Sequence, residues 1–380
     1  MLIFRSLAVQ ATQSDGSKLL GRRHLAALRS TWHLATLFGW GLAALFFWMA
    51  RPDRSLAGLA VAIADAGAPA AERRAAVMEA VSGYQHTMRR LAPQGSLDVW
   101  YQTTRADAPH IAGLQMDAEA RAVVRRAVDK ARRRNNRSLL DQVAERRTDG
   151  SWRLQTDPPI LTPVDAETRE GVVTGLERYA ETLPRERRFM LDRYHVVDVA
   201  HRVVGVGSVG TRAYLALLFG NSDADALFLQ VKEAVRPAHA PYLPRVPAPF
   251  SGHEGERVFY GQRLLQAVGD PLLGWTSIAG RPFYVRQMKN LKGAIPLARM
   301  SGAPLLTFSY AYGTLLARAH ARTGDAAAIA GYCGSGKHHD LSGAIADWAA
   351  SYAERNAADF ALFRAAIASG RLEAADDPCL

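Results

Sequence analysis

The sequence predicts an α+β fold with a small, mostly antiparallel sheet and a large helical part. Apolar residues recur at helical spacing over 55–91 and again over 296–380, whereas 195–234 consists of short apolar runs divided by turn residues. Helical and strand patterns therefore occupy separate stretches of the chain, which is typical of α+β proteins. The 380 residues, 48% of them hydrophobic, suffice for two domains or one large mixed domain.

Four regions follow from this division. They are a divergent N-terminal segment (1–54), a helical region with a connector (55–165), a glycine-loop and sheet region (166–295) and a C-terminal helical region (296–380).

The N-terminal segment contains a run, 31–50, without Asp, Glu, Lys or Arg. Twenty such residues are long enough to span a bilayer, and Trp32 and Trp48 sit where interfacial aromatic residues would. The alternatives are a membrane helix, a buried core helix, or sequence that is not native to this fold. Only two cysteines occur, Cys333 and Cys379, so no disulfide framework is available. We expect a cytoplasmic protein, with membrane association through 31–50 as the alternative.

The net charge favours anionic partners. Lys plus Arg number 47 against 36 Asp plus Glu, which gives +11 at pH 7. Nucleotides, nucleic acid and acidic lipid all fit this charge, and charge alone does not choose among them. The basic run over 121–137 is more typical of a solvated helix face than of a nucleic-acid interface, so no specific nucleic-acid partner is expected. The oligomeric state stays open.

The elements are predicted in order along the chain. Helices cover 55–91, interrupted at 67–69, and then 117–146; a connector with a turn, a short strand and two prolines covers 149–164. A charged helix over 167–193 precedes the strand region, and a helix over 254–268 follows it. The remaining predicted elements are a strand over 281–293 and helices over 305–323, 325–332 and 343–369.

The stretch "VVGVGSVGTRAYLALLFG", residues 203–220, carries the clearest functional pattern. Gly205, Gly207 and Gly210, with Ser208 among them, satisfy G-x-G-x-x-G. Three interpretations compete. A dinucleotide loop needs a helix that opens at the last glycine. A kinase-like phosphate loop lies between two strands, and a structural turn has no ligand.

The residues that follow favour the kinase-like loop. Lys232 comes after the aliphatic run of "LFLQVKEA", where kinases place the lysine that contacts the α- and β-phosphates. Glu256, at the start of the next predicted helix, is the expected partner of Lys232, with Glu254 and Glu233 as competitors. Arg286, on the later strand, is a further candidate phosphate contact. The predicted ligand is ATP with Mg²⁺.

Candidates for catalysis are sparse. "HARTGD" supplies His320 and Asp325, but neither the asparagine nor the second aspartate of a kinase catalytic segment follows. "GYCGSGKH", 331–338, resembles a P-loop except that His338 replaces its final Ser or Thr. No metal site is predicted.

Several stretches together resemble the DUF2252 family of bacterial proteins. They include "VGVGSVGTR", "LFLQVKEA", "GERVFYGQRLLQA", "DPLLGWT" and "LARAHARTGDAAAIAGY", and the resemblance extends over about 55–372. The positions that match are Gly205, Gly207, Gly210, Thr211, Arg212, Lys232, Glu233, Glu256, Gln262, Arg286, Gln287, His320 and Asp325.

The resemblance implies a kinase-like fold related to aminoglycoside phosphotransferases, in circularly permuted order. Members of the family usually carry a Gly-Asp-Ala-His segment with a following Asn, and then Asp-Phe-Asp, before the region that begins here near residue 55. Residues 1–54 show neither segment. Two explanations compete for the lack of these segments in residues 1–54. One is a truncated or frame-shifted gene, which is favoured, and the other is a membrane anchor that replaced the catalytic half.

The sequence thus indicates a nucleotide-binding, kinase-like protein that has lost its catalytic N-terminal motifs and is inactive or incomplete as a phosphotransferase. The alternative is a non-catalytic interaction protein that is membrane-anchored or binds anions.

Overall fold

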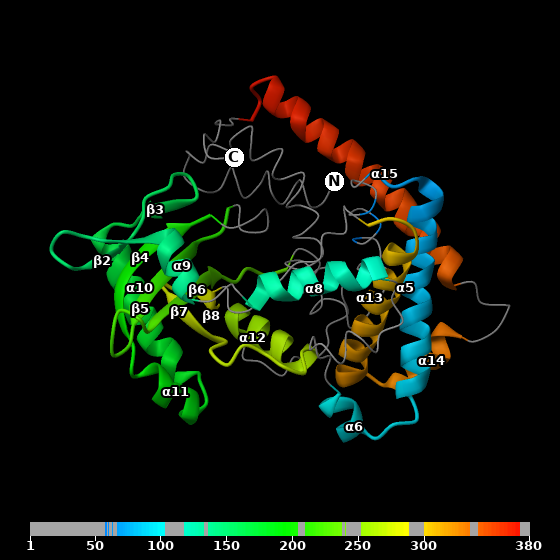
Figure 1. Cartoon of the computed structure of the whole chain (residues 1–380), viewed down its shortest axis with the longest axis horizontal. Helices are drawn as coiled ribbons and strands as arrows, with labels where there is room; N and C mark the ends of the chain where they lie inside the picture. The colour runs from blue at the N-terminus through cyan, green and yellow to red at the C-terminus, as the bar shows by residue number, and fades with distance from the viewer. Residues whose placement is uncertain are drawn as a thin grey trace.

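The computed structural model describes residues 67–102, 118–132, 136–203, 210–237, 252–288, 300–334 and 341–372, together with 58, 60, 63 and 240. These ranges form a sheet half and a helical half (Figure 1). The predicted combination of antiparallel sheet and many helices is confirmed. The N-terminal segment, with its apolar run 31–50, lies outside the described residues. Within the ranges given, no helix has the length and apolar character needed to cross a membrane.

The sheet half contains six antiparallel strands in the order β3-β4-β5-β6-β8-β7. Strand β5 and the first six residues of β6 are buried, as expected of central strands with both faces covered. Strand β8 inserts between β6 and β7, so the lysine strand β6 has β8 as its neighbour. The strands are β3 (Leu161–Pro163), β4 (His195–Arg202), β5 (Ala213–Phe219), β6 (Ala226–Glu233), β7 (Gly274–Ile278) and β8 (Arg281–Gln287).

One face of the sheet is covered by α10 (Ala166–Glu181), and we call it the α10 face. Tyr179 of α10 belongs to one buried cluster with Val231 of β6 and Phe283 of β8. The helix predicted over 167–193 is in fact two helices, α10 and α11 (Arg185–Leu191), because Pro184 at the N-cap of α11 interrupts the helical backbone.

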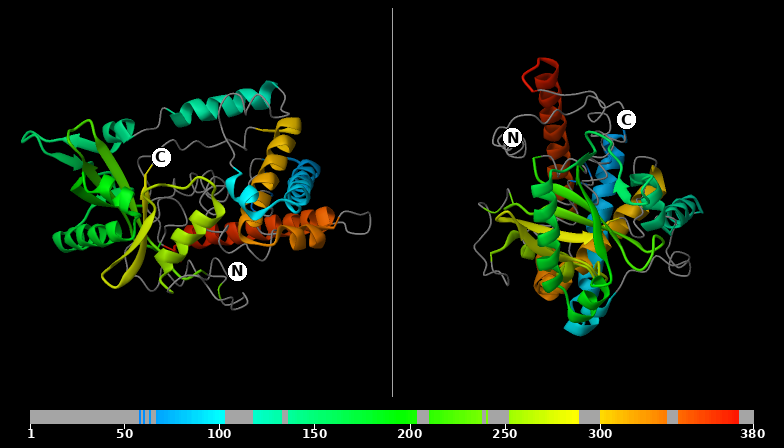
Figure 2. Two further views of the ribbon diagram at one scale, coloured as in Figure 1. Left: turned by 90° about the horizontal axis from the view of Figure 1, so that it is seen from below. Right: turned by 90° about the vertical axis from the view of Figure 1, so that its left-hand side faces the viewer.

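The opposite face, called the α12 face, is covered by two helices at different ends. Leu139 of α9 (Asn136–Val143) packs in a buried cluster with Phe228 of β6. At the other end α12 (Glu254–Leu265) lies against β7 and β8, where the Trp275 ring centroid is 4.8 Å from that of Phe259. A right-angle view shows the sheet with its helices beside it (Figure 2).

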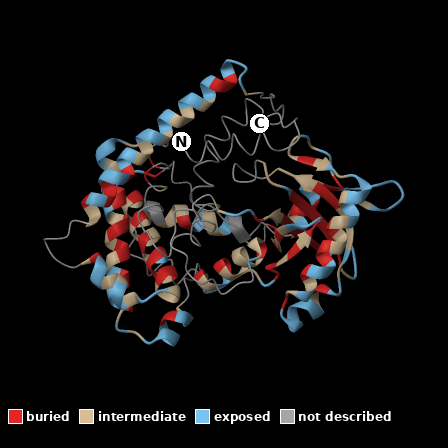
Figure 3. Cartoon of the chain, turned by 180° about the vertical axis from the view of Figure 1, so that it is seen from behind, coloured by how far each residue is buried: buried red, intermediate tan, exposed pale blue. Residues whose placement is uncertain are grey.

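The helical half is organised around the crossing of α5 (Ala70–Leu91) and α13 (Gly302–Thr323). A Cβ atom at Gly313 would lie 1.8 Å from the Ala80 carbonyl oxygen, and one at Gly83 would lie 2.2 Å from that of Tyr310. Only glycine permits backbones to approach this closely. The buried residues of this crossing form a second core (Figure 3). The surrounding helices are α6 (Ser96–Tyr101), α8 (Ala118–Arg132), α14 (Ala326–Cys333) and α15 (Leu341–Ala368).

The structure differs from the sequence predictions at two further points. The helix expected over 117–146 is α8 followed by α9, and its end is the strand β1 (Ala144–Arg146), which pairs with β2 (Trp152–Leu154). Strand β7 was not predicted. It forms a hairpin with β8 through Ala279 and Gly280, whose φ angles of 47° and 71° suit a two-residue turn with the twist of the flanking strands.

Candidate functional site

The glycine run joins β4 to β5, two antiparallel neighbours. Gly210 ends the run with a φ of 78°, in the region that favours glycine. Gly205, Gly207 and Ser208 lie outside the described residues. Strand β5 starts at Ala213, whereas a dinucleotide loop requires a helix there. The structure therefore excludes the dinucleotide alternative.

Lys232 lies near the end of β6, on the α12 face. Its neighbour Val231 points to the α10 face, and side chains alternate along a strand, so Lys232 takes the opposite direction. Lys232 is paired across the strands with Tyr284 of β8. Tyr284 is in turn paired with Trp275, whose ring packs against α12.

His253 anchors the start of α12 to the sheet. Its Nδ1 accepts a hydrogen bond from the Glu256 backbone N–H at 3.2 Å, and its Nε2 lies 3.0 Å from Ser277 Oγ. Because Nδ1 accepts, Nε2 carries the proton of the neutral ring and donates to Ser277. Burial lowers the pKa of His253, which favours this neutral form. The cap holds Glu256 in the first turn of the helix.

Glycine at the first turn lets α12 lie directly on strand β8. A Cβ atom at Gly255 would be 2.1 Å from the Phe283 carbonyl oxygen. The structure thus brings the start of α12, with Glu256, to the face of the sheet that carries Lys232. A direct Lys232–Glu256 bond stays a prediction. Of the competing carboxylates, Glu254 pairs with Arg257 at 2.5 Å.

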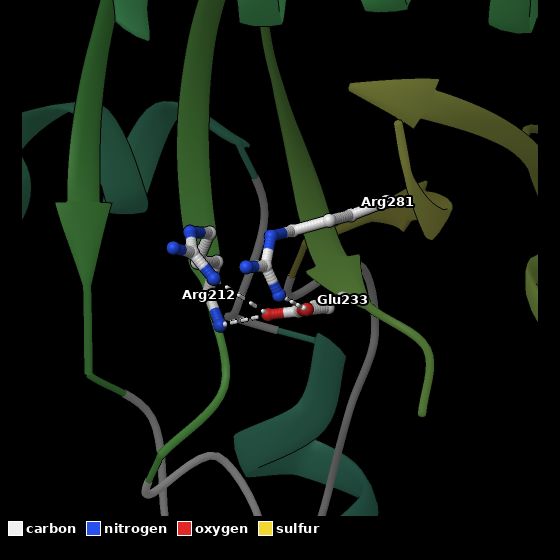
Figure 4. Close-up of polar contacts among 3 residues, drawn as sticks. All are labelled: Arg212, Glu233 and Arg281. Carbon is white, nitrogen blue, oxygen red and sulfur yellow. Dashed lines mark hydrogen bonds and ion pairs between the residues drawn. The ribbon is translucent and has the colours of Figure 1, made fainter. Parts of the chain in front are cut away.

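Glu233, the other competitor, lies on the α10 face and binds two arginines (Figure 4). Its Oε2 accepts from the Arg212 backbone N–H at 2.9 Å and lies 3.6 Å from Arg212 Nη1. Its Oε1 lies 3.2 Å from Arg281 Nη1. The Glu233 side chain is only 8% exposed. These contacts fasten Arg212, two residues after the glycine run, to the strand that carries Lys232.

Arg286 lies on the α12 face beside Lys232. Its Nε and Nη2 both donate to Gln230 Oε1 at 3.0 Å, and the guanidinium lies 5.9 Å from the centroid of the Tyr284 ring. Gln230 is buried and sits two residues before Lys232 on β6, which places its side chain on the same face. The predicted phosphate contact and the predicted lysine therefore share one polar strip.

Arg202 is a fourth member of this strip that the sequence pattern did not predict. It is the last residue of β4. Ala200 of β4 is paired with Leu215 of β5, and Leu215 is paired with Gln230 of β6, so these three side chains lie on the α12 face. Arg202 is two residues after Ala200 and therefore lies on the same face. Its Nη1 donates to Met288 Sδ at 3.4 Å, from across the sheet. The sequence does show a charged residue at the end of a strand, directly before the glycine run. The face to which its side chain points depends on how β4 pairs with β5, which the sequence does not show.

The structure does not bring His320 and Asp325 to this strip. His320 is buried in the helical half, where its Nδ1 is 2.9 Å from Tyr84 Oη. Burial lowers the pKa of His320 to about 4. The Asp325 carboxylate accepts from the backbone N–H groups of Ala327 and Ala328 and caps α14. Both side chains thus have structural contacts, and their catalytic roles stay a prediction.

The sequence profile of one family, described as "Uncharacterized protein conserved in bacteria (DUF2252)", matches residues 50–366. The chain belongs to the DUF2252 family. The match includes all of the described sheet half, so the polar strip lies within the DUF2252 part of the chain. Comparison with curated proteins and with solved structures found no match.

Proposed function

We propose that this DUF2252 protein binds ATP through the glycine run and Lys232. The observation that carries the proposal is the order of elements: strand β4, glycine run, strand β5, a lysine at the end of β6, and then a helix with Glu256 in its first turn. Protein kinases present their phosphate-binding parts in the same succession. Lys232 and the start of α12 lie on one face of the sheet, which the pairing of such a lysine with its glutamate requires.

The charges of the site support a phosphate ligand. Arg286 and Arg202 lie on the face that carries Lys232, and the planar guanidinium of arginine matches the geometry of phosphate oxygens. Cationic side chains on a partly buried surface stabilise phosphate oxygens more strongly than exposed ones do.

The described residues offer ligands for phosphate but no group of ligands for Mg²⁺. Among them, no group of three or more His, Cys, Asp or Glu side chains is placed to hold a metal ion. The role proposed for this part of the chain is therefore to bind and orient phosphate groups. The proposed activity is nucleotide binding without efficient phosphoryl transfer.

The test is thermal unfolding of the full chain with and without millimolar Mg²⁺-ATP. Ligand binding raises stability by mass action, by about 2.7 kcal/mol at a hundredfold excess over Kd. We expect Lys232→Ala to lower ATP affinity at least tenfold, since it removes the cation that contacts the phosphates. Lys130→Ala in α8 is the control for loss of a positive charge. Equal losses in the two variants, or no ATP effect in the wild type, contradict the proposal.

A second pair of variants examines the glutamate. Glu256→Gln is expected to weaken ATP binding, because Lys232 loses the carboxylate that orients it. Glu254→Gln, in the same helical turn, removes an equal charge that pairs with Arg257 and should leave affinity unchanged. An effect confined to Glu254→Gln would exclude Glu256 as the partner.

A further inference from the structure

Two guanidinium groups on the α12 face have no carboxylate partner among the residues that the structure describes. Arg202 has one contact there, from Nη1 to Met288 Sδ, and its buried Nε has no hydrogen-bond partner. Arg286 contacts the neutral Gln230 and the ring of Tyr284.

Three other arginines of the sheet half have a carboxylate partner, and one of them, Arg257, is partly buried. Arg257 pairs with Glu254, and Arg212 and Arg281 share Glu233. Removing a guanidinium from water without a counter-ion is costly, and burial lowers the pKa of Arg202 accordingly. A methionine sulfur is a weak acceptor and offsets little of this cost. The arrangement of Arg202 is therefore unfavourable in the absence of an anion.

Both side chains lie on the α12 face, and both have contacts along β8 or with Met288, the residue that follows it. Arg202 reaches Met288, which continues β8 through a hydrogen bond from its N–H to the Phe228 carbonyl oxygen. Arg286 is two residues earlier on the same face, about 7 Å along the strand. Buried Gln230 is directly paired with Arg286 and holds its guanidinium in place.

We infer that Arg202 and Arg286 form an oxyanion-binding site, for a phosphate or carboxylate group of a small-molecule ligand. The planar guanidinium matches the geometry of such groups and can donate two parallel hydrogen bonds to them. The ATP proposal is carried by the glycine run and Lys232, and the two arginines only add to the charge of that face, so each proposal can fail without the other.

The test is thermal unfolding of the full chain in low millimolar orthophosphate, with chloride used to equalise ionic strength. We expect stabilisation in the wild type and at least a tenfold loss of apparent phosphate affinity in Arg202→Met and in Arg286→Met. Arg188→Gln, an exposed arginine of α11 beside the other face, is the matched control and should respond like the wild type. No stabilisation of the wild type, or a shift that Arg202→Met and Arg286→Met both retain, overturns the inference.

The ligand-free proteins provide a second readout. An apolar residue of similar length in place of an unpaired buried charge is often neutral or stabilising. Arg202→Met is therefore expected to unfold at the wild-type temperature or above it when no anion is present. If it instead unfolds at a lower temperature and still responds to phosphate, Arg202 is a structural residue and the inference is wrong.

Two sources of the anion are separated by adding orthophosphate to protein already saturated with Mg²⁺-ATP. A further shift that depends on Arg202 assigns the site to a second ligand. A shift with ATP alone that Arg202→Met abolishes, with no further effect of orthophosphate, assigns it to the phosphates of the nucleotide. If Lys232→Ala removes the orthophosphate response while Arg202→Met keeps it, phosphate binds elsewhere and the inference fails.

Discussion

At the residue scale, burial fixes the charge of His320. The ring is 4% exposed, contacts Tyr84 and has a pKa lowered to about 4, so it is neutral at pH 7. The unfolded chain, with a histidine pKa near 6.5, binds the proton first as pH falls. Burying the neutral His320 ring therefore costs no deprotonation above pH 6.5, where its contribution to the free energy of unfolding is complete. That contribution is lost as the pH falls towards 4.

His320→Gln is expected to remove this pH dependence. By linkage, the shift corresponds to about 3 kcal/mol between pH 7 and pH 4. Urea unfolding at several pH values measures it, and the variant should show a smaller fall in unfolding free energy than the wild type. His86→Gln, which replaces an exposed histidine of α5, is the control. An unchanged slope in His320→Gln would mean that other groups cause the acid sensitivity.

At the element scale, the crossing of α5 and α13 depends on glycine. A methyl group at Gly313 would meet the Ala80 backbone at 1.8 Å, so Gly313→Ala must push the helices apart. We expect a loss of about 1–3 kcal/mol, the usual range for overpacking a core. Denaturant unfolding provides the measurement.

Gly331→Ala is the matched control for this substitution. Gly331 is also helical, in α14, but nothing lies within 4 Å of its added Cβ. Alanine there should raise stability by about 0.4–1 kcal/mol, because it restricts the unfolded chain. If both variants lost stability to a similar extent, the close crossing of α5 and α13 would not be the cause of the loss in Gly313→Ala.

The sequence predicted where helices and strands lie along the chain better than it predicted which strands pair with each other. The strands around the glycine run and the helix that begins at Glu254 follow from apolar runs and turn residues, and the order of loop, Lys232 and Glu256 follows from chain order. Strand β7 was missed because its alternating pattern is only five residues long. The role of Arg202 was missed because it depends on pairing through β5 and β6, which no local pattern in β4 reveals.

At the scale of the whole molecule, Arg322 connects the two halves. From α13 it donates to the Leu264 carbonyl oxygen at 3.0 Å and to that of Gln266 at 3.4 Å, at the C-terminal end of α12. It also donates to the Trp100 carbonyl oxygen and lies 4.0 Å from the centroid of the Trp100 ring. A single guanidinium thereby satisfies carbonyl groups at a helix end, where they lack partners in the helix itself.

Arg322→Lys should weaken this connection, since an ammonium group lacks the planar fork that reaches several carbonyl groups at once. We expect a loss of about 2 kcal/mol, within the range for hydrogen bonds made by charged groups. Calorimetry is the measurement, and a broader or divided unfolding transition is expected as the halves become less coupled. Arg355→Lys on the exposed side of α15 is the control, and an identical effect there would argue against a special role.

Helix α12 belongs to both halves at once. Its N-terminal turn rests on β8 and carries Glu256, and its C-terminal carbonyl groups are held by Arg322 of α13. The helix has 12 residues and is about 18 Å long, and it has no proline or break between these two contacts. It is therefore a continuous rigid element between the two halves. A rotation of the helical half about the sheet would therefore move Glu256 relative to β8 and to Lys232 on the neighbouring strand.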